Sequence, residues 1–77
     1  MNKQRRKEIT RALDLIAEAK DIIECAMGDE QDAFDHLPDG IRCSDKGDEM
    51  EENVSSLEYA FDSLEEIEEE LDKFKPE

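Results

Sequence analysis

The apolar residues of this chain recur at helical spacing in two stretches, and a turn sequence separates the stretches. In the first stretch, the apolar positions are Ile9, Leu13, Ile16, Ile23 and Met27. Lys20 occupies the heptad position between Ile16 and Ile23. The second stretch repeats at intervals of three and four through Met50, Val54, Leu57, Phe61, Leu64, Ile67, Leu71 and Phe74. This spacing puts an apolar stripe on each of two α-helices. The charged fraction of 44% and the net charge of −14 are typical of disorder, but a disordered chain has no reason to keep such spacing.

The sequence therefore predicts an all-α fold in a single domain of residues 1–77. We expect an antiparallel two-helix hairpin with helices at about 3–35 and 45–74. A loop is expected at about 36–44, because the Pro-Asp-Gly sequence that starts at Pro38 favours a turn. Matched helix lengths and a short connection favour helices that pack side by side in opposite directions.

Two local features bear on the helix ends. Gly28 is a weak point in the first helix, since glycine costs about 1 kcal/mol inside a helix. Phe34 nevertheless continues the stripe one heptad after Met27, so we expect the helix to run through Gly28. Ser44 or Asp45 can cap the start of the second helix.

A second apolar stripe lies beside the first on the same helix, at Ala12, Leu15, Ala19, Ile22 and Ala26. The two stripes together cover about half of the helix circumference, more than the ~100° that one neighbouring helix requires. We therefore expect a homo-oligomer, most simply a dimer that forms a four-helix bundle. Its interface is predicted at Leu15, Ile22, Ala12 and Ala19.

The charges at the helix ends are unfavourable for each helix alone. Lys3, Arg5, Arg6 and Lys7 crowd the start of the first helix, and the second helix ends in the acidic run 65–70. The helix dipole disfavours cations at a helix start and anions at a helix end. In a hairpin these ends are expected to lie within a turn or two of each other and to compensate.

The acidic balance excludes several kinds of partner. Nucleic acid and anionic membranes repel such a surface, because binding them needs clustered Lys and Arg. No stretch approaches the ~20 apolar residues needed to span a bilayer. No apolar leader follows Met1, so we expect a cytoplasmic protein with reduced thiols.

Catalysis, cofactors and metals are not expected. Acid–base catalysis needs carboxylates in a cleft where burial separates their pKa values, and a two-helix hairpin offers no deep cleft. Cys25, His36 and Cys43 are too few and too scattered for a structural zinc site. We expect Cys25 to be a small core residue and His36 to lie on the loop surface. The segment 45–48 does not match the calcium spacing of an EF-hand.

Arg42, Lys46 and Gly47 surround the start of the second helix and form a candidate anion site. The plainer interpretation of these residues is loop closure and capping. Neighbouring carboxylates at Asp45 and Asp48 would repel a phosphate.

The acidic residues of the second helix are the most informative feature for function. A helical rod studded with carboxylates is suited to the basic surface of a nucleic-acid-binding protein. The alternative is a merely solvated surface. The predicted partner-binding acidic face consists of Glu51, Glu52, Glu58, Asp62, Glu65, Glu66, Glu69 and Asp72.

Three segments resemble a group of small acidic helical proteins of bacteriophages and mobile elements. They are the opening Met-Asn-Lys with its basic residues, the central AFDHLPDG, and SDKGDEMEENVSSLEYAFDSLEEIEEEL. The resemblance implies a two-helix hairpin of phage or prophage origin. It also implies inhibition of a host defence protein, by mimicking DNA, by obstructing an effector or by sequestering a nucleotide signal.

The leading hypothesis is thus a non-enzymatic inhibitor that binds a host protein with a basic surface. One alternative is a structural or assembly module that binds another helix through its apolar face. A second alternative is a sponge for a small nucleotide signal at the candidate anion site.

Overall fold

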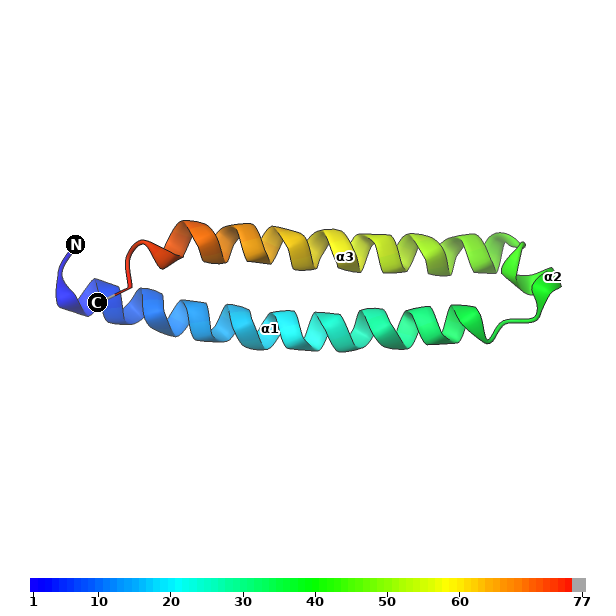
Figure 1. The fold of residues 1–77 in the computed structure, drawn as a ribbon, viewed down its shortest axis with the longest axis horizontal. Coiled ribbons are helices and arrows are strands. Elements are labelled where there is room, and N and C mark those ends of the chain that lie inside the picture. The colour runs from blue at the N-terminus through cyan, green and yellow to red at the C-terminus, as the bar shows by residue number, and fades with distance from the viewer. Residues whose placement is uncertain (76–77) are drawn as a thin grey trace.

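The computed structural model describes residues 1–75 and contains three helices: α1 (Lys3–Asp35), α2 (Asp39–Arg42) and α3 (Asp45–Asp72) (Figure 1). No strand occurs in these residues, so the all-α prediction is confirmed. The two long helices pack together along a rod of 58 × 15 × 14 Å.

The helix boundaries follow the prediction with two differences. α1 ends at Asp35 and runs without a break through Gly28, as expected. The segment expected to be a loop contains the short helix α2, in which the N–H groups of Ile41 and Arg42 both donate to the carbonyl of Pro38 at 2.9 Å. α3 ends at Asp72, two residues before the predicted end, because the chain tightens there into an i→i+3 bond from Phe74 N–H to the carbonyl of Leu71.

The two long helices begin with different caps. The side chain of Asn2 accepts a 2.8 Å hydrogen bond from the Arg5 N–H, which satisfies one of the free donors at the start of α1. Ser44 holds the N-cap position of α3, as predicted, but its hydroxyl donates back to the carbonyl of Ile41 and caps nothing. Only α1 therefore has a side-chain cap.

The core is a single seam between α1 and α3. Leu13 is its one buried apolar side chain among the described residues, at 6% exposure. Half-buried residues such as Ile16, Ile23 and Met27 extend the seam along α1. Lys20 lies on the same seam, where its ammonium is 2.7 Å from Glu68.

Three contacts between α1 and α3 give the relative order of the two helices. Arg6 Nη1 donates to the carbonyl of Phe74 at 3.2 Å, Lys20 pairs with Glu68, and Asn53 Nδ2 donates to Glu30 at 2.8 Å. Residues later in α1 therefore contact residues earlier in α3. Figure 1 correspondingly shows the start of α1 and the end of α3 at the same end of the rod.

The expected compensation of charges at the helix ends is not found within residues 1–75. None of the ion pairs there joins the basic residues at the start of α1 to the acidic run 65–70. The reason is the alignment of the helices: Glu68 lies opposite Lys20, which is thirteen residues and about 20 Å beyond Lys7. Arg6 instead binds the carbonyl of Phe74.

The turn between the long helices is held by Arg42. Its guanidinium donates to the carbonyls of Asp35 and Leu37 at 2.9 and 3.1 Å and lies 5.9 Å from the centre of the Phe34 ring. Gly47 in the first turn of α3 is buried against the backbone of Arg42, where any Cβ would overlap the Arg42 carbonyl oxygen. The close approach of α2 and α3 thus requires glycine at this position.

Candidate interaction surface

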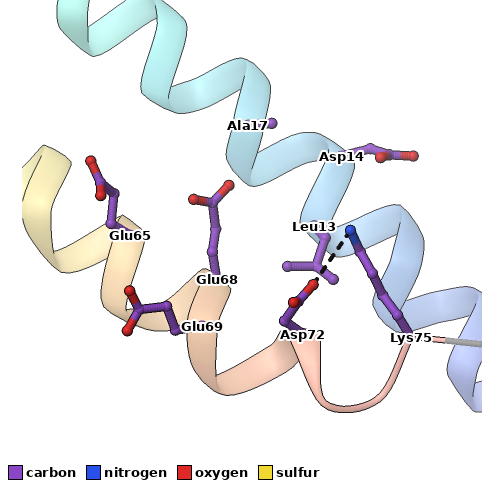
Figure 2. Close-up of a pocket in the computed structure, with 8 residues that line it drawn as sticks. All are labelled: Leu13, Asp14, Ala17, Glu65, Glu68, Glu69, Asp72 and Lys75. Carbon is purple, nitrogen blue, oxygen red and sulfur yellow. Dashed lines mark ion pairs between the residues drawn. The ribbon is translucent and has the colours of Figure 1, made fainter.

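A groove with acidic walls lies between α1 and the last turns of α3 (Figure 2). It has a volume of about 360 Å³, and Leu13 and Ala17 of α1 provide its apolar surface. The carboxylates that line it are Asp14 from α1 and Glu65, Glu68, Glu69 and Asp72 from α3. Lys75 is the one basic residue in the lining and is paired with Asp72 at 3.4 Å.

A second and wider groove, of about 670 Å³, continues between the same helices toward the turn. Met27, Val54 and Phe61 provide its apolar surface. Its acidic residues are Glu24 from α1 and Glu58 and Asp62 from α3.

The two grooves follow one side of the seam, because Glu58, Glu65 and Asp72 are spaced by sevens along α3 and share a face. We call the carboxylates that line them the acidic flank: Asp14, Glu24, Glu58, Asp62, Glu65, Glu68, Glu69 and Asp72. The structure thus brings together five residues of the predicted acidic face, namely Glu58, Asp62, Glu65, Glu69 and Asp72. Glu51, Glu52 and Glu66 are exposed but do not line the grooves.

Three members of the acidic flank were not predicted from the sequence: Asp14, Glu24 and Glu68. The first two belong to α1, and their presence depends on which side of α1 faces α3. Glu68 was not predicted because it lies seven residues after Phe61, at a heptad position of the apolar stripe. Its role depends on Lys20 lying opposite.

Two ion pairs that include an α3 carboxylate each shift the pKa of one of their members. A hydrogen bond to Glu68, together with the charge of that carboxylate, raises the pKa of Lys20 above its ordinary value. A hydrogen bond from Lys73 at 2.8 Å lowers the pKa of Glu70. Both effects keep the charged forms in place at neutral pH.

The predicted oligomer interface lies on the other side of the seam from the acidic flank. Ile22 is 69% exposed and Leu15 is 51% exposed, which is unusual for large apolar side chains. Ala12 and Ala19 of the same stripe are half-buried. We call this stripe the apolar flank: Ala12, Leu15, Ala19, Ile22 and Ala26.

Two of the three residues of the candidate anion site make contacts within the turn. Arg42 binds backbone carbonyls and Gly47 packs on the Arg42 backbone, while Lys46 is exposed. These contacts agree with the plainer interpretation of loop closure, and binding of a nucleotide here stays a prediction.

Cys25, Cys43 and His36 do not come together. Cys25 was expected in the core but is exposed, because it lies on the side of α1 that faces away from α3. Cys43 is also exposed, and both thiols are free. His36 is exposed at the end of α1 as expected, with Nδ1 2.6 Å from the carbonyl of Asp32. Among the described residues no group of His, Cys, Asp and Glu is arranged to hold a metal ion.

None of the helices in residues 1–75 combines the length and the apolar character that crossing a membrane would require. Comparison with protein-family models, with curated proteins and with solved structures gives no match to this chain. The acidic flank and the apolar flank are therefore the two surfaces from which we infer a function.

Proposed function

We propose that this chain is a non-catalytic interaction protein of phage or mobile-element origin that binds and inhibits a bacterial host protein through the acidic flank. The observation that carries the proposal is that carboxylates from both helices line two grooves on the same side of the seam. A merely solvated acidic surface would not need to gather its charges around apolar grooves.

The groove chemistry suits lysine and arginine side chains. Such side chains have long apolar stems with a charged head at the end. Leu13 and Ala17 offer apolar surface for the stem, and the carboxylates of Glu65 and Glu69 lie beside it for the head. A partner that presents several basic side chains in a row would match both grooves.

Mimicry of DNA is one way in which such binding could inhibit a host protein. The net charge of −14 along a 58 Å rod corresponds to about one net charge per 4 Å. Duplex DNA carries one charge per ~1.7 Å. A single copy thus has less than half of the charge density of DNA, and a DNA-like density needs two copies side by side.

The fold that we propose for this function is an antiparallel helical hairpin that pairs with a second copy into a four-helix bundle. The falling order of partners along α3 supports the antiparallel arrangement. The exposed apolar flank supports pairing. Pairing through this flank would leave the acidic flank accessible.

The test uses two variants with equal net charge. The groove variant carries Glu58→Gln, Glu65→Gln and Glu69→Gln; the control variant carries Glu52→Gln, Glu66→Gln and Glu70→Gln. Tagged forms of both and of the unaltered chain are used to capture proteins from bacterial lysate at low and high salt. We expect a basic protein on the unaltered chain and on the control, released by salt or by competing DNA and lost from the groove variant.

Capture that is equal for the groove variant and the control would contradict a specific role of the acidic flank. Capture that does not change between low and high salt would contradict the electrostatic mechanism altogether, because exposed charge pairs are screened by salt. The captured protein is then assayed for its own activity with and without the chain. Unchanged activity would contradict inhibition.

The exposed Ile22 side chain favours a second candidate function, an assembly module that binds another helix. Binding of this kind depends on apolar contact, so it should be insensitive to salt. Ile22→Glu should abolish such binding, and the groove variant should retain it. The opposite pattern would reject the assembly module.

A further inference from the structure

We infer that the apolar flank packs against the same flank of a second copy in an antiparallel, two-fold arrangement with Ala19 on the two-fold axis. The inference goes beyond the proposed function, because it specifies the orientation and centre of an interface that binding through the acidic flank does not use.

The first observation is the symmetry of the stripe. Ala12 and Ala26 lie seven residues before and after Ala19, while Leu15 lies four before it and Ile22 three after it. A two-fold rotation about Ala19 therefore places Ala12 of one copy opposite Ala26 of the other. It also places Leu15 of one copy close to Ile22 of the other. Small residues at the centre allow two helix backbones to approach closely, so that Leu15 and Ile22 can pack on either side.

The second observation is the position of Ala19 in the helix. α1 spans Lys3–Asp35, so Ala19 is its middle residue. A two-fold axis at Ala19 overlaps the two α1 helices over their whole length. An isologous contact needs such a self-complementary surface.

The third observation is the uneven charge along α1. Its beginning carries Lys3, Arg5, Arg6, Lys7 and Arg11, with Glu8 as the only acidic residue up to Arg11. Its last twelve residues, from Glu24 to Asp35, carry acidic residues and no basic one. Antiparallel pairing sets the basic part of one copy against the acidic part of the other, whereas parallel pairing sets like charges together.

Arg11 and Asp29 provide a specific pair in this arrangement. They are eighteen residues apart, five full turns, and so project from the same edge of the apolar flank. A two-fold axis at Ala19 puts Arg11 of one copy level with residue 27 of the other, about 3 Å along the axis from Asp29. Both side chains are exposed and so accessible to a second copy.

The fourth observation is the small core of a single copy. One buried apolar side chain among the described residues, Leu13, is little for a chain of 77 residues. Chains of this size usually need reinforcement, and oligomerisation is one common form. Covering Leu15 and Ile22 would supply the missing burial.

The first experiment is sedimentation of the full chain at moderate salt, where we expect a dimer. Ile22→Glu should shift the species toward the monomer. If that variant unfolds, its circular dichroism will reveal it, and disulfide trapping then serves as an independent test. A monomer for the unaltered chain at tens of micromolar would overturn the inference.

Disulfide trapping tests the orientation in a background of Cys25→Ser and Cys43→Ser. Ala19→Cys should cross-link to itself, because residue 19 lies on the axis. Ala12→Cys and Ala26→Cys should each fail to cross-link alone and should cross-link when mixed. Parallel pairing predicts the reverse for the last two variants, and self-linked Ala12→Cys would therefore overturn the inference.

Charge reversal tests the proposed pair. Arg11→Glu should raise the dissociation constant of the dimer by about tenfold, since two symmetric exposed pairs are lost. Adding Asp29→Arg should restore it. Failure of the double variant to recover would reject this pairing, and hence the axis at Ala19.

These measurements use no partner protein. A dimer that captures no basic protein would refute the proposed function and leave the interface standing. A monomer that captures a basic protein at low salt would do the opposite. If both hold, two copies side by side carry about one net charge per 2 Å of rod, close to the ~1.7 Å of duplex DNA.

Discussion

The ammonium of Lys20 lies 2.7 Å from a carboxylate oxygen of Glu68 across the seam between α1 and α3. It also lies 4.9 Å from the centre of the Phe61 ring. The side chains of Lys20 and Glu68 are 19% and 27% exposed. The one cation on the α1 seam between residues 9 and 27 is thus matched by a carboxylate and an aromatic face from α3.

The ion pair between Lys20 and Glu68 should make the stability of the fold vary with pH in the alkaline range. The pKa of Lys20 is raised in the folded protein above the ordinary 10.5, mainly by the hydrogen bond to Glu68. A raised lysine pKa stabilises the fold below pH 10.5, and this stabilisation is lost as the pH rises through the raised pKa. We expect the free energy of unfolding, measured with urea and circular dichroism, to fall in that range. Lys20→Met should reduce the fall, and an identical slope in the variant would contradict the prediction.

Leu13→Ala should destabilise the protein most among the apolar-to-alanine changes on the seam. Leu13 is the most deeply buried apolar side chain of the described residues, and removing such a side chain typically costs about 2–5 kcal/mol. We expect about 2 kcal/mol, since the seam is narrow and can partly collapse. Tyr59→Ala is the control: Tyr59 is 76% exposed, so its loss should change the free energy of unfolding by less than about 0.5 kcal/mol. Equal effects of the two changes would be inconsistent with the seam described above.

Two glycine-to-alanine changes in helices should have opposite signs. Gly28→Ala should stabilise by roughly 1 kcal/mol, because alanine favours the helix and a Cβ at Gly28 meets nothing within 4 Å. Gly47→Ala should destabilise, because the added Cβ would overlap the carbonyl oxygen of Arg42 and force α2 and α3 apart. Thermal unfolding of the two variants measures both effects. Stabilisation by both changes would mean that the turn adjusts freely.

The sequence predicts the two long helices well, but it does not predict how α1 and α3 are aligned against each other. Both long helices were predicted to within two residues, since their apolar periodicity extends over many turns and glycine at Gly28 could not outweigh it. The alignment was not predicted, because apolar stripes repeat every heptad and do not say which turn faces which. For this reason, no ion pair among the described residues provides the expected compensation between the basic start of α1 and the run 65–70.

The same limit applied to the candidate site. Five of the six α3 members of the acidic flank, Glu58 and Glu65 among them, could be found from their heptad spacing on one helix, whereas Glu68 could not. Asp14 and Glu24 could not, because their position depends on the side of α1 that faces α3. α2 was missed since a single helical turn after Pro38 has no periodicity to detect.

Added salt should raise the melting temperature. The net charge of −14 makes the folded chain repel itself, and salt shortens the range of this repulsion from about 10 Å at 0.1 M to about 3 Å at 1 M. We expect a steady rise across that range in thermal unfolding. The variant with Glu52→Gln, Glu66→Gln and Glu70→Gln should show a smaller rise. A melting temperature that falls with salt would mean that ion pairs outweigh the repulsion.

The pairing of Lys20 with Glu68 also restricts how α3 can slide along α1. A slip of one heptad would leave most apolar residues of the seam against other apolar residues. It would, however, bring Phe61 or Lys75 into the place of Glu68, and Lys20 would lose its carboxylate in either direction. A half-buried cation without a partner is costly, whereas the apolar residues alone would tolerate several positions. We therefore expect Lys20 to select one alignment, and replacing Lys20 and Glu68 together by leucine to give a mixture of slipped hairpins.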